Sequence, residues 1–256
     1  DQESKNEPRT EINRHCTKAE LDRAVFALRK RLNIPESDQP LDMISLCEAL
    51  PNLALGFPPF KTPGLKGVSC LSTDGGPDII LLNGNLSWRE NNFTCGHELI
   101  HITLHRDGPA KSFNCFEKAR PNQDRFLEWQ ENEGDAELLL PARVLLPLVR
   151  ERYPALHTWK DYLRFKGELA ENFRITEAVV TFRFESLKYE ITQYLSGIPY
   201  EEVRILSSAK QRESGLHIKS LNDLEAECLA QESDRLRRIH RRMLDFHSID
   251  IAYDRR

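Results

Sequence analysis

The sequence predicts an α+β fold that is mostly helical, with a small antiparallel sheet packed on a pair of helices and a helical module in the C-terminal part. Three observations lead to this fold class. Apolar residues recur at helical spacing along much of the chain, two short β-prone runs flank a turn-rich linker, and the pattern beyond Pro154 is helical almost throughout. With 256 residues, of which 39% are hydrophobic, the chain can bury one substantial core, or one core plus a smaller helical module. We expect two domains, residues 15–155 and residues 156–256.

The N-terminal part of the chain predicts two helices followed by a sheet. Apolar residues recur with helical period over 21–32, and a second, shorter helix is expected over 41–50. Residues 51–67 are punctuated by Pro and Gly and predict loops and short extended pieces. The runs 67–71 and 78–83 flank a linker typical of a turn, so they predict an antiparallel pair of strands.

A capping box predicts where the next helix begins. The Ser87 side chain can accept a hydrogen bond from the backbone amide three residues on, and Glu90 can reach back to the serine amide, so we expect a helix from there to about His105. Residues 107–124 are rich in Gly, Pro, Asn and charge and predict a surface loop. Later helices are expected over 125–140, which Pro141 ends, 158–172, 176–195, 199–212, and from Ser220 onward.

Composition and charge exclude several classes of protein. A net charge of -4 gives no global attraction to nucleic acid, so DNA binding would need a local basic face. No stretch is long and apolar enough to span a bilayer, and the first 20 residues are too polar for a secretion signal. The six cysteines form no C-x-x-C pair and are too sparse for a disulfide scaffold. We therefore expect a cytoplasmic protein with reduced thiols and no membrane partner.

The segment from His97 to His101 has the pattern H-E-x-x-H, and it lies inside the helix predicted from the capping box. Residues four apart share one helix face, so both imidazoles can converge on one ion while Glu98 lies beside it. Zinc held by three protein ligands keeps a fourth position for water and lowers the pKa of that water to about 7. Glu98 is then expected to act as general base and to pass the proton to the leaving amine. The alternative is an ordinary amphipathic helix whose histidines are solvated or hydrogen-bonded.

The third ligand is left open by the histidine pair. In one class of zinc peptidases a glycine precedes the third histidine ligand, but no glycine lies between His101 and His105. We therefore expect His105 to orient a ligand or to end the helix. A carboxylate on the following helix is the other option. That helix offers Glu128, Glu131 and Glu133.

Two segments of the chain match a longer signature. Residues 92–105 are similar to the pattern F-T-x-x-H-E-x-x-H-x-x-L-H, and Glu128, Asn132 and residues 138–141 are similar to the helix E-x-x-A-N-x-F-A-x-x-L-L-M-P. Both patterns belong to the ImmA/IrrE family of metallopeptidases, which this chain resembles over roughly 15–190. The β-prone run that precedes the first segment also resembles the sheet of that family.

The resemblance implies a ligand set. By position, the third zinc ligand of the family falls on Glu128, beside His97 and His101, with Asn132 one turn later as a residue that supports the ligands. Manganese or iron would suit two histidines and a glutamate almost as well as zinc, because ligand type alone discriminates poorly between these metals.

The sequence departs from the family pattern at Glu131, Gly134 and Asp135, where small or apolar residues are usual. Glu131 and Asp135, four residues apart, can themselves imitate a ligand and the residue that orients it. Because Glu131 is about one helical turn from Glu128 on nearly the same face, it stays open as the alternative third ligand.

The resemblance also implies a function. Members of the family cleave a helix-turn-helix repressor at one site and so relieve transcriptional repression in stress responses or mobile elements. For this chain it implies a bacterial cytoplasmic protease with a single protein target. We expect the substrate to add as an extended strand to the sheet near 78–83.

Helical segments beyond the motif allow other functions. Residues 169–183 resemble a helix-turn-helix, but their mixed charge favours packing or grip on a protein substrate over direct DNA binding. A basic run at 235–242 is normally a solvated face. Two rivals to the protease remain: a DNA-binding or protein-binding regulator whose metal is structural or vestigial, and one half of a toxin and antitoxin pair that acts by binding.

Overall fold

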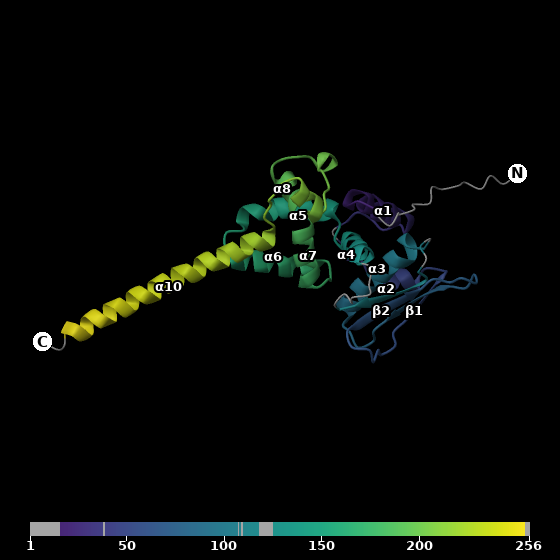
Figure 1. Ribbon diagram of the computed structural model, residues 1–256, viewed down its shortest axis with the longest axis horizontal. Coiled ribbons are helices and arrows are strands. Elements are labelled where there is room, and N and C mark those ends of the chain that lie inside the picture. The colour runs from purple at the N-terminus through teal and green to yellow at the C-terminus, as the bar shows by residue number, and fades with distance from the viewer. Residues whose placement is uncertain (1–15, 38, 107, 109, 118–124, 254–256) are drawn as a thin grey trace.

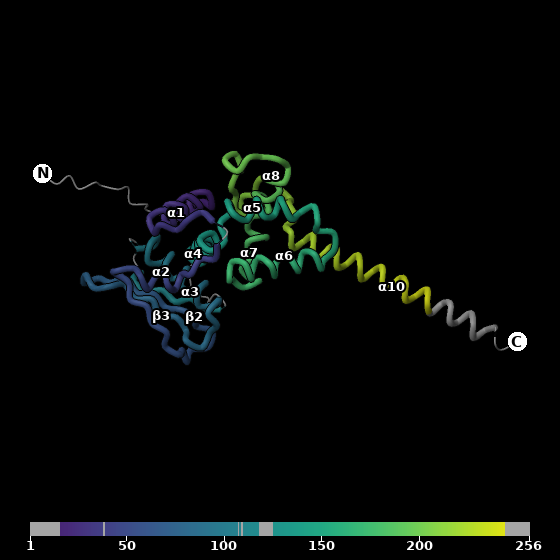
Figure 2. Tube along the Cα trace, turned by 180° about the vertical axis from the view of Figure 1, so that it is seen from behind, coloured from purple at the N-terminus to yellow at the C-terminus, as the bar shows by residue number. Residues whose placement is uncertain are grey.

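The computed structural model describes residues 16–37, 39–106, 108, 110–117 and 125–253, with side chains described as far as Met243. Figure 1 shows a sheet and helices α1 to α4 in one part of the molecule, helices α5 to α8 in another, and α10 projecting away from both. Figure 2 shows the same arrangement from behind, with α4 between α3 and the later helices. The predicted α+β class, mostly helical, is confirmed.

The sheet covers one face of α3. Among the described residues it has four strands in the order β1-β3-β2-β4. Their bounds are β1 (Leu53–Gly56), β2 (Leu65–Cys70), β3 (Asp78–Leu82) and β4 (Ser112–Phe116). The predicted antiparallel pair is present as β2 and β3, in which Gly67 faces Leu82 and Cys70 faces Ile79.

The sheet differs from the prediction in being mixed. β1 lies parallel to β3, because the chain leaves β1, forms β2 and returns along β3 in the original direction. β4 lies inside the segment predicted as a surface loop and pairs with β2. β3 has neighbours on both sides, so the expectation that a substrate strand adds at 78–83 is wrong. Among the described strands, β1 and β4 lie at the two ends of the order.

Helix α3 (Trp88–Leu104) begins where the capping box predicts. The Ser87 side chain accepts from the Glu90 amide, and the Glu90 carboxylate accepts from the Ser87 amide. The helix packs against the sheet on one side and against α4 (Arg125–Leu139) on the other. Close approach of the two helices requires Gly96, because a Cβ there would lie 1.8 Å from an Asp135 oxygen.

Two N-terminal helices complete this part of the core. Helix α1 (Lys18–Arg31) packs on α4, and helix α2 (Met43–Glu48) packs on α3. A continuous set of buried apolar side chains runs from α1 and the sheet through α3 and α4 into α5 to α8. The division at residue 155 into two domains stays a prediction.

The later helices begin with α5 (Ala142–Arg152), and the predicted helix over 158–172 is α6 (Trp159–Asn172). The predicted helix over 176–195 is interrupted at Leu187, which separates α7 (Glu177–Ser186) from α8 (Lys188–Leu195).

Two short turns of 3-10 helix, η1 (Tyr153–Ala155) and η2 (Tyr200–Glu202), and helix α9 (Ser208–Glu213) complete this part. The predicted helix over 199–212 is reduced to η2 and α9. Gln193 and Glu190 accept hydrogen bonds from the backbone amides of Arg204 and Leu206, so the segment between them is held extended.

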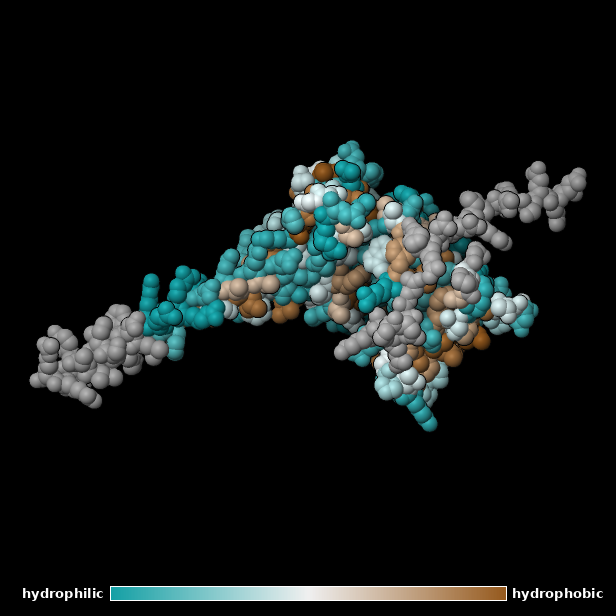
Figure 3. Space-filling model, in the orientation of Figure 1, coloured by the Kyte–Doolittle hydropathy of each residue, from teal (hydrophilic) through white to brown (hydrophobic). Residues whose placement is uncertain are grey.

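Helix α10 (Leu221–Tyr253) begins at the predicted place and leaves the body of the molecule. The part of α10 between the body of the molecule and the grey end in Figure 3 is mainly hydrophilic, with single exposed apolar residues such as Leu236 and Met243. In the part of the chain that the structure describes, none of the helices is both long and apolar enough to cross a membrane.

Candidate metal centre

Two histidines and one glutamate meet between α3 and α4. His97 and His101 lie one turn apart on α3 and are 1% and 3% exposed. From α4, Glu131 places one carboxylate oxygen 3.3 Å from Nε2 of His97 and the other 2.9 Å from Nδ1 of His101. Within the described residues these three form the group whose ligand atoms lie close enough together to hold a metal ion.

The structure therefore brings the alternative ligand, Glu131, to the histidines and leaves Glu128 outside the group. The register between the helices explains this. Gly96 lets Asp135 approach α3, and Gly134 lies against Ile100, so the turn of α4 that contains Glu131 is opposite the two histidines. Glu128 is one turn nearer the start of α4. Burial and the negative charge of Glu131 raise the pKa of the Glu128 carboxyl.

Unsatisfied polar atoms at the centre of the group fit a bound cation. Both ring nitrogens of His97, Nε2 of His101 and both carboxylate oxygens of Glu131 are buried without a hydrogen bond of good geometry to any described residue. Leaving such atoms unpaired in a dry interior is costly, and a divalent metal satisfies nitrogen and oxygen donors together. The donor set of two imidazoles and one carboxylate matches that chemistry.

The protonation states of the group favour a cation. Burial alone would raise the pKa of Glu131, but the close imidazoles of His101, His105 and His97 hold it below the usual range. Burial lowers the pKa of His101 to about 4, which leaves its imidazole neutral near pH 7. Burial also opposes the charged form of His97, but Cys115 and Glu131 raise its pKa well above the usual value. A metal ion can replace that proton as the charge that balances Glu131.

Glu98 lies on the sheet side of α3 and is fully buried. One carboxylate oxygen accepts a hydrogen bond of 2.5 Å from Ser69 on β2, and the other has no partner among the described residues. Burial raises the pKa of Glu98 to about 7, opposed by the positive charge of His97 and the Ser69 hydroxyl. A carboxylate with this pKa and one free oxygen is suited to accept and return a proton near neutral pH.

One face of the sheet forms a wall beside the group, and sequence reasoning missed its residues. Phe113 on β4 stacks on His101 with ring centroids 4.0 Å apart, and Cys115, two residues on, is buried beside His97. Gly67 pairs with Cys115 and has no room for a side chain, because a Cβ would lie 2.8 Å from Glu98. The available signal was the alternation of apolar and polar residues over 112–116.

The residues predicted to support the ligands occupy different places. His105 contacts Glu131 at 3.3 Å through Nδ1 and Gln130 at 3.0 Å through Nε2. Asn132 instead donates to the backbone carbonyl of Glu128 within its own helix. Asp135 is fully buried beside Gly96, and both its oxygens lack a partner among the described residues. The charge of His97 lowers the pKa of Asp135, but burial raises it well above the usual value.

A comparison with models of known protein families identifies a match that spans this region of the chain. Residues 54–185 match the family model Peptidase_M78, described as the IrrE N-terminal-like domain. The match starts in β1, ends in α7, spans more than half of the chain and includes the histidines, Glu98 and Glu131. It also crosses residue 155, where the sequence predicts a domain boundary. A search among curated proteins finds no match.

Proposed function

Because the chain belongs to the Peptidase_M78 family, which is a family of metallopeptidases, we propose that it is a zinc-dependent endopeptidase. In this proposal His97, His101 and Glu131 bind the metal and Glu98 is the general base. The observation that carries it is the buried set of unsatisfied nitrogen and oxygen atoms directly beside a carboxylate with a raised pKa. Manganese and iron remain the alternatives to zinc, since the donor set suits all three.

The residues of the chain divide the chemistry between them. When bound, the metal would act as a Lewis acid and would lower the pKa of a water to near 7. Glu98 would accept a proton on its free oxygen from the attacking water, whose oxygen bonds to the scissile carbonyl carbon, and would return the proton to the amide nitrogen as the carbon–nitrogen bond breaks. Ser69 holds the other oxygen and fixes the orientation of the carboxylate. Phe113 and Cys115 shield the histidines from solvent, which strengthens electrostatic interactions within the site.

The substrate that we propose is a helix-turn-helix transcriptional repressor in the bacterial cytoplasm. Its cleavage would release a stress response or a mobile element from repression, as the ImmA/IrrE resemblance implies. An extended segment of the repressor can lie along the end of the sheet at β4, which is last in the order of the described strands and contributes the Phe113 that stacks on His101.

A purely associative regulator is the second candidate. The exposed arginines of α10, such as Arg238 and Arg241, favour an acidic partner or DNA backbone. The helix-turn-helix-like pair α6 and α7 gives this candidate less support. Arg183 of α7 is 0% exposed and pairs with Glu133 and Glu137 on α4, so it is not available to DNA.

A Glu98→Gln variant separates the two candidates. The purified protein, loaded with zinc, is incubated with repressors encoded near its own gene. We expect wild type to cut one of them at a single site and Glu98→Gln to keep its metal while cleaving at least about 100-fold more slowly, the usual contribution of a general base. Glu48→Gln, which removes an exposed carboxylate on α2, is the control and should cleave normally.

Equal cleavage by wild type and Glu98→Gln would contradict the assignment of the base. A stable complex with a repressor that stays intact after prolonged incubation with zinc would support the binding function instead.

A further inference from the structure

A groove lies next to the metal centre, between the sheet and α7. It has a volume of about 780 Å³ and is lined by residues of β2, α3, α4 and α7. Its surface is mostly apolar and includes the side chains of Phe93, Val179 and Phe182. The chemistry proposed for the metal centre uses none of the residues that line this groove.

The groove approaches the metal centre along two helices. On α3 it is lined by Phe93, which lies one turn before His97, or about 6 Å along the helix axis. Residues four apart share one face of a helix, so Phe93 and His97 lie on the same side of α3. On α4 the groove is lined by Asn132, the residue after Glu131. An extended peptide advances about 3.3 Å per residue, so a chain held at the metal reaches the groove within a few residues.

Contacts within the protein fix both sides of the groove. Lys66 lines it from β2, at the point where the pairing of β2 with β4 shifts register between Leu65 and Gly67. An irregularity of this kind turns a side chain away from the regular alternation of a strand. Arg89 lines the groove from α3 and forms an ion pair at 2.7 Å with Glu171 near the end of α6. The groove is therefore formed before any substrate binds, as is usual for ligand sites.

Most polar side chains of the groove already have partners. Ser87 donates hydrogen bonds from its amide and its hydroxyl to Glu90, and Asn132 donates to the backbone carbonyl of Glu128. The Lys66 ammonium forms no hydrogen bond or ion pair with a described residue, so it is available as a donor. An occupant with a large apolar side chain and a peptide carbonyl near Lys66 fits this surface.

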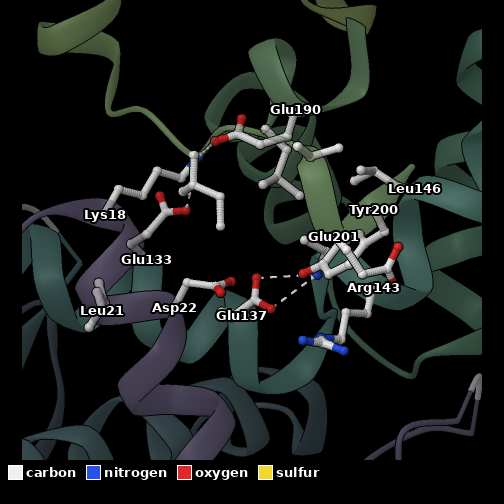
Figure 4. A pocket seen from close by; sticks show the side chains of 14 residues that line it. Lys18, Leu21, Asp22, Glu133, Glu137, Arg143, Leu146, Glu190, Tyr200 and Glu201 are labelled. Atoms are coloured by element: carbon white, nitrogen blue, oxygen red, sulfur yellow. Dashed lines mark hydrogen bonds and ion pairs between the residues drawn. The ribbon is translucent and has the colours of Figure 1, made fainter. Parts of the chain in front are cut away.

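The cavity drawn in Figure 4 is of a different kind. It lies between α1, α4, α5 and α8, and its carboxylates pair with cations of the protein itself. Lys18 contacts Glu190 at 3.0 Å, and Arg183 binds Glu137. No occupant is needed to compensate these groups, and the residues that line this cavity include none of the three metal ligands.

We propose that the groove beside α3 is a specificity subsite of the peptidase, which takes large apolar side chains from an extended segment of the substrate. Phe93, Val179 and Phe182 contact those side chains, and Lys66 donates to a peptide carbonyl. From Ser87 to Phe93 the groove follows α3 for about 9 Å, the length of about three residues of extended peptide. This inference rests on the proposed function, because it describes the segment that the metal centre would cut.

Peptide hydroxamates, which bind zinc through the hydroxamate group, test the groove without any cleavage. Acetyl-Phe-Phe-Gly-hydroxamate and N-hydroxysuccinamoyl-Phe-Phe-amide extend from the metal in opposite directions along a bound chain. Each has a counterpart in which alanine replaces both phenylalanines. Calorimetric titration into the zinc-loaded full chain measures the four affinities. In one of the two pairs we expect the phenylalanine probe to bind at least about tenfold more tightly, because its rings are removed from water in the groove.

Three variants locate this preference in the groove. Ala178→Trp fills the groove from an exposed position on α7 and should reduce the preference to less than about threefold. Phe182→Ala removes part of an apolar wall and should reduce it by at least about threefold. Ala230→Trp makes the same change as Ala178→Trp at an exposed position on α10 and should keep the full preference.

The outcomes separate this inference from the proposed function. If none of the four hydroxamates binds, the proposed metal site is wrong and the subsite falls with it. If the alanine probes bind but neither pair shows a preference for phenylalanine, or if Ala178→Trp keeps as much preference as Ala230→Trp, the subsite alone is overturned. Circular dichroism checks that each variant is folded. If Ala178→Trp does not fold, an unchanged preference in Phe182→Ala overturns the subsite instead.

Discussion

Replacing Glu131 with Gln tests which carboxylate completes the metal centre. The substitution keeps the size of the side chain and removes its negative charge. The matched variant is Glu128→Gln, which makes the same change one helical turn earlier, at a residue outside the group of ligand atoms. We predict that Glu131→Gln lowers the affinity for zinc far more than Glu128→Gln does.

The expected size of the effect follows from the contacts. Losing a residue that merely orients a metal ligand typically costs 10-fold to 100-fold in affinity, or about 1.4–2.7 kcal/mol. Glu131 itself touches ring nitrogens of both histidines and is 0% exposed, so water cannot replace the lost charge. We therefore expect more than about 100-fold weaker binding for Glu131→Gln. Glu128 is only partly buried and lies outside the group of ligand atoms. We therefore expect Glu128→Gln to weaken zinc binding by less than about tenfold.

Competition with a chromophoric chelator near neutral pH measures both affinities, and circular dichroism confirms that the variants are folded. If Glu128→Gln loses as much affinity as Glu131→Gln, or more, the assignment of Glu131 and the helix register behind it are refuted.

Three further predictions concern stability. Gly96→Ala should destabilise the protein by about 1–2 kcal/mol in urea unfolding, because the strain of overpacking against Asp135 exceeds the gain in helix propensity. The control is Gly167→Ala, where the added Cβ would have its nearest neighbour at 3.7 Å. This control should stabilise the protein by up to about 1 kcal/mol. The raised pKa of Glu137 stabilises the fold at low pH, and this stability is lost as pH rises through about 7. Glu137→Gln should therefore reduce the fall in unfolding free energy between acidic and mildly alkaline pH by about 1–3 kcal/mol. If the variant shows the same pH profile as wild type, the Glu137 carboxyl is not the source of that fall. Removing zinc by chelation should lower the melting temperature by roughly 10 °C, since a ligand at 1,000 times its Kd adds about 4 kcal/mol; equal melting with and without zinc would mean that the metal does not bind the native state.

Local signals in the sequence were sufficient for the helix that contains the two histidines. Ser87 and Glu90 define its start, and a spacing of four residues places His97 and His101 on one face whatever surrounds them. The choice between Glu128 and Glu131 depended on something else, the register of α4 against α3. That register is set by the contact of Gly96 with Asp135, and no pattern within either helix reveals it.

Long-range pairing explains most of the other differences. β4 is short and lies in a segment rich in turn formers, so its place beside β2 follows only from the folded sheet. The residues after α8 do not continue as a helix because Glu190 and Gln193 bind backbone amides of 204 and 206. These bonds join side chains and backbone groups more than ten residues apart, beyond the reach of helical periodicity.

Anomalous diffraction from crystals of the zinc-loaded protein, recorded on both sides of the zinc absorption edge, locates the metal relative to the two histidines and the carboxylates of α4. We expect one strong peak within bonding distance of His97, His101 and Glu131, next to Glu98 and with a position left for water. A peak bound by Glu128 in place of Glu131, one closed off by a fourth protein ligand, or no peak between α3 and α4 would contradict the proposed metal site.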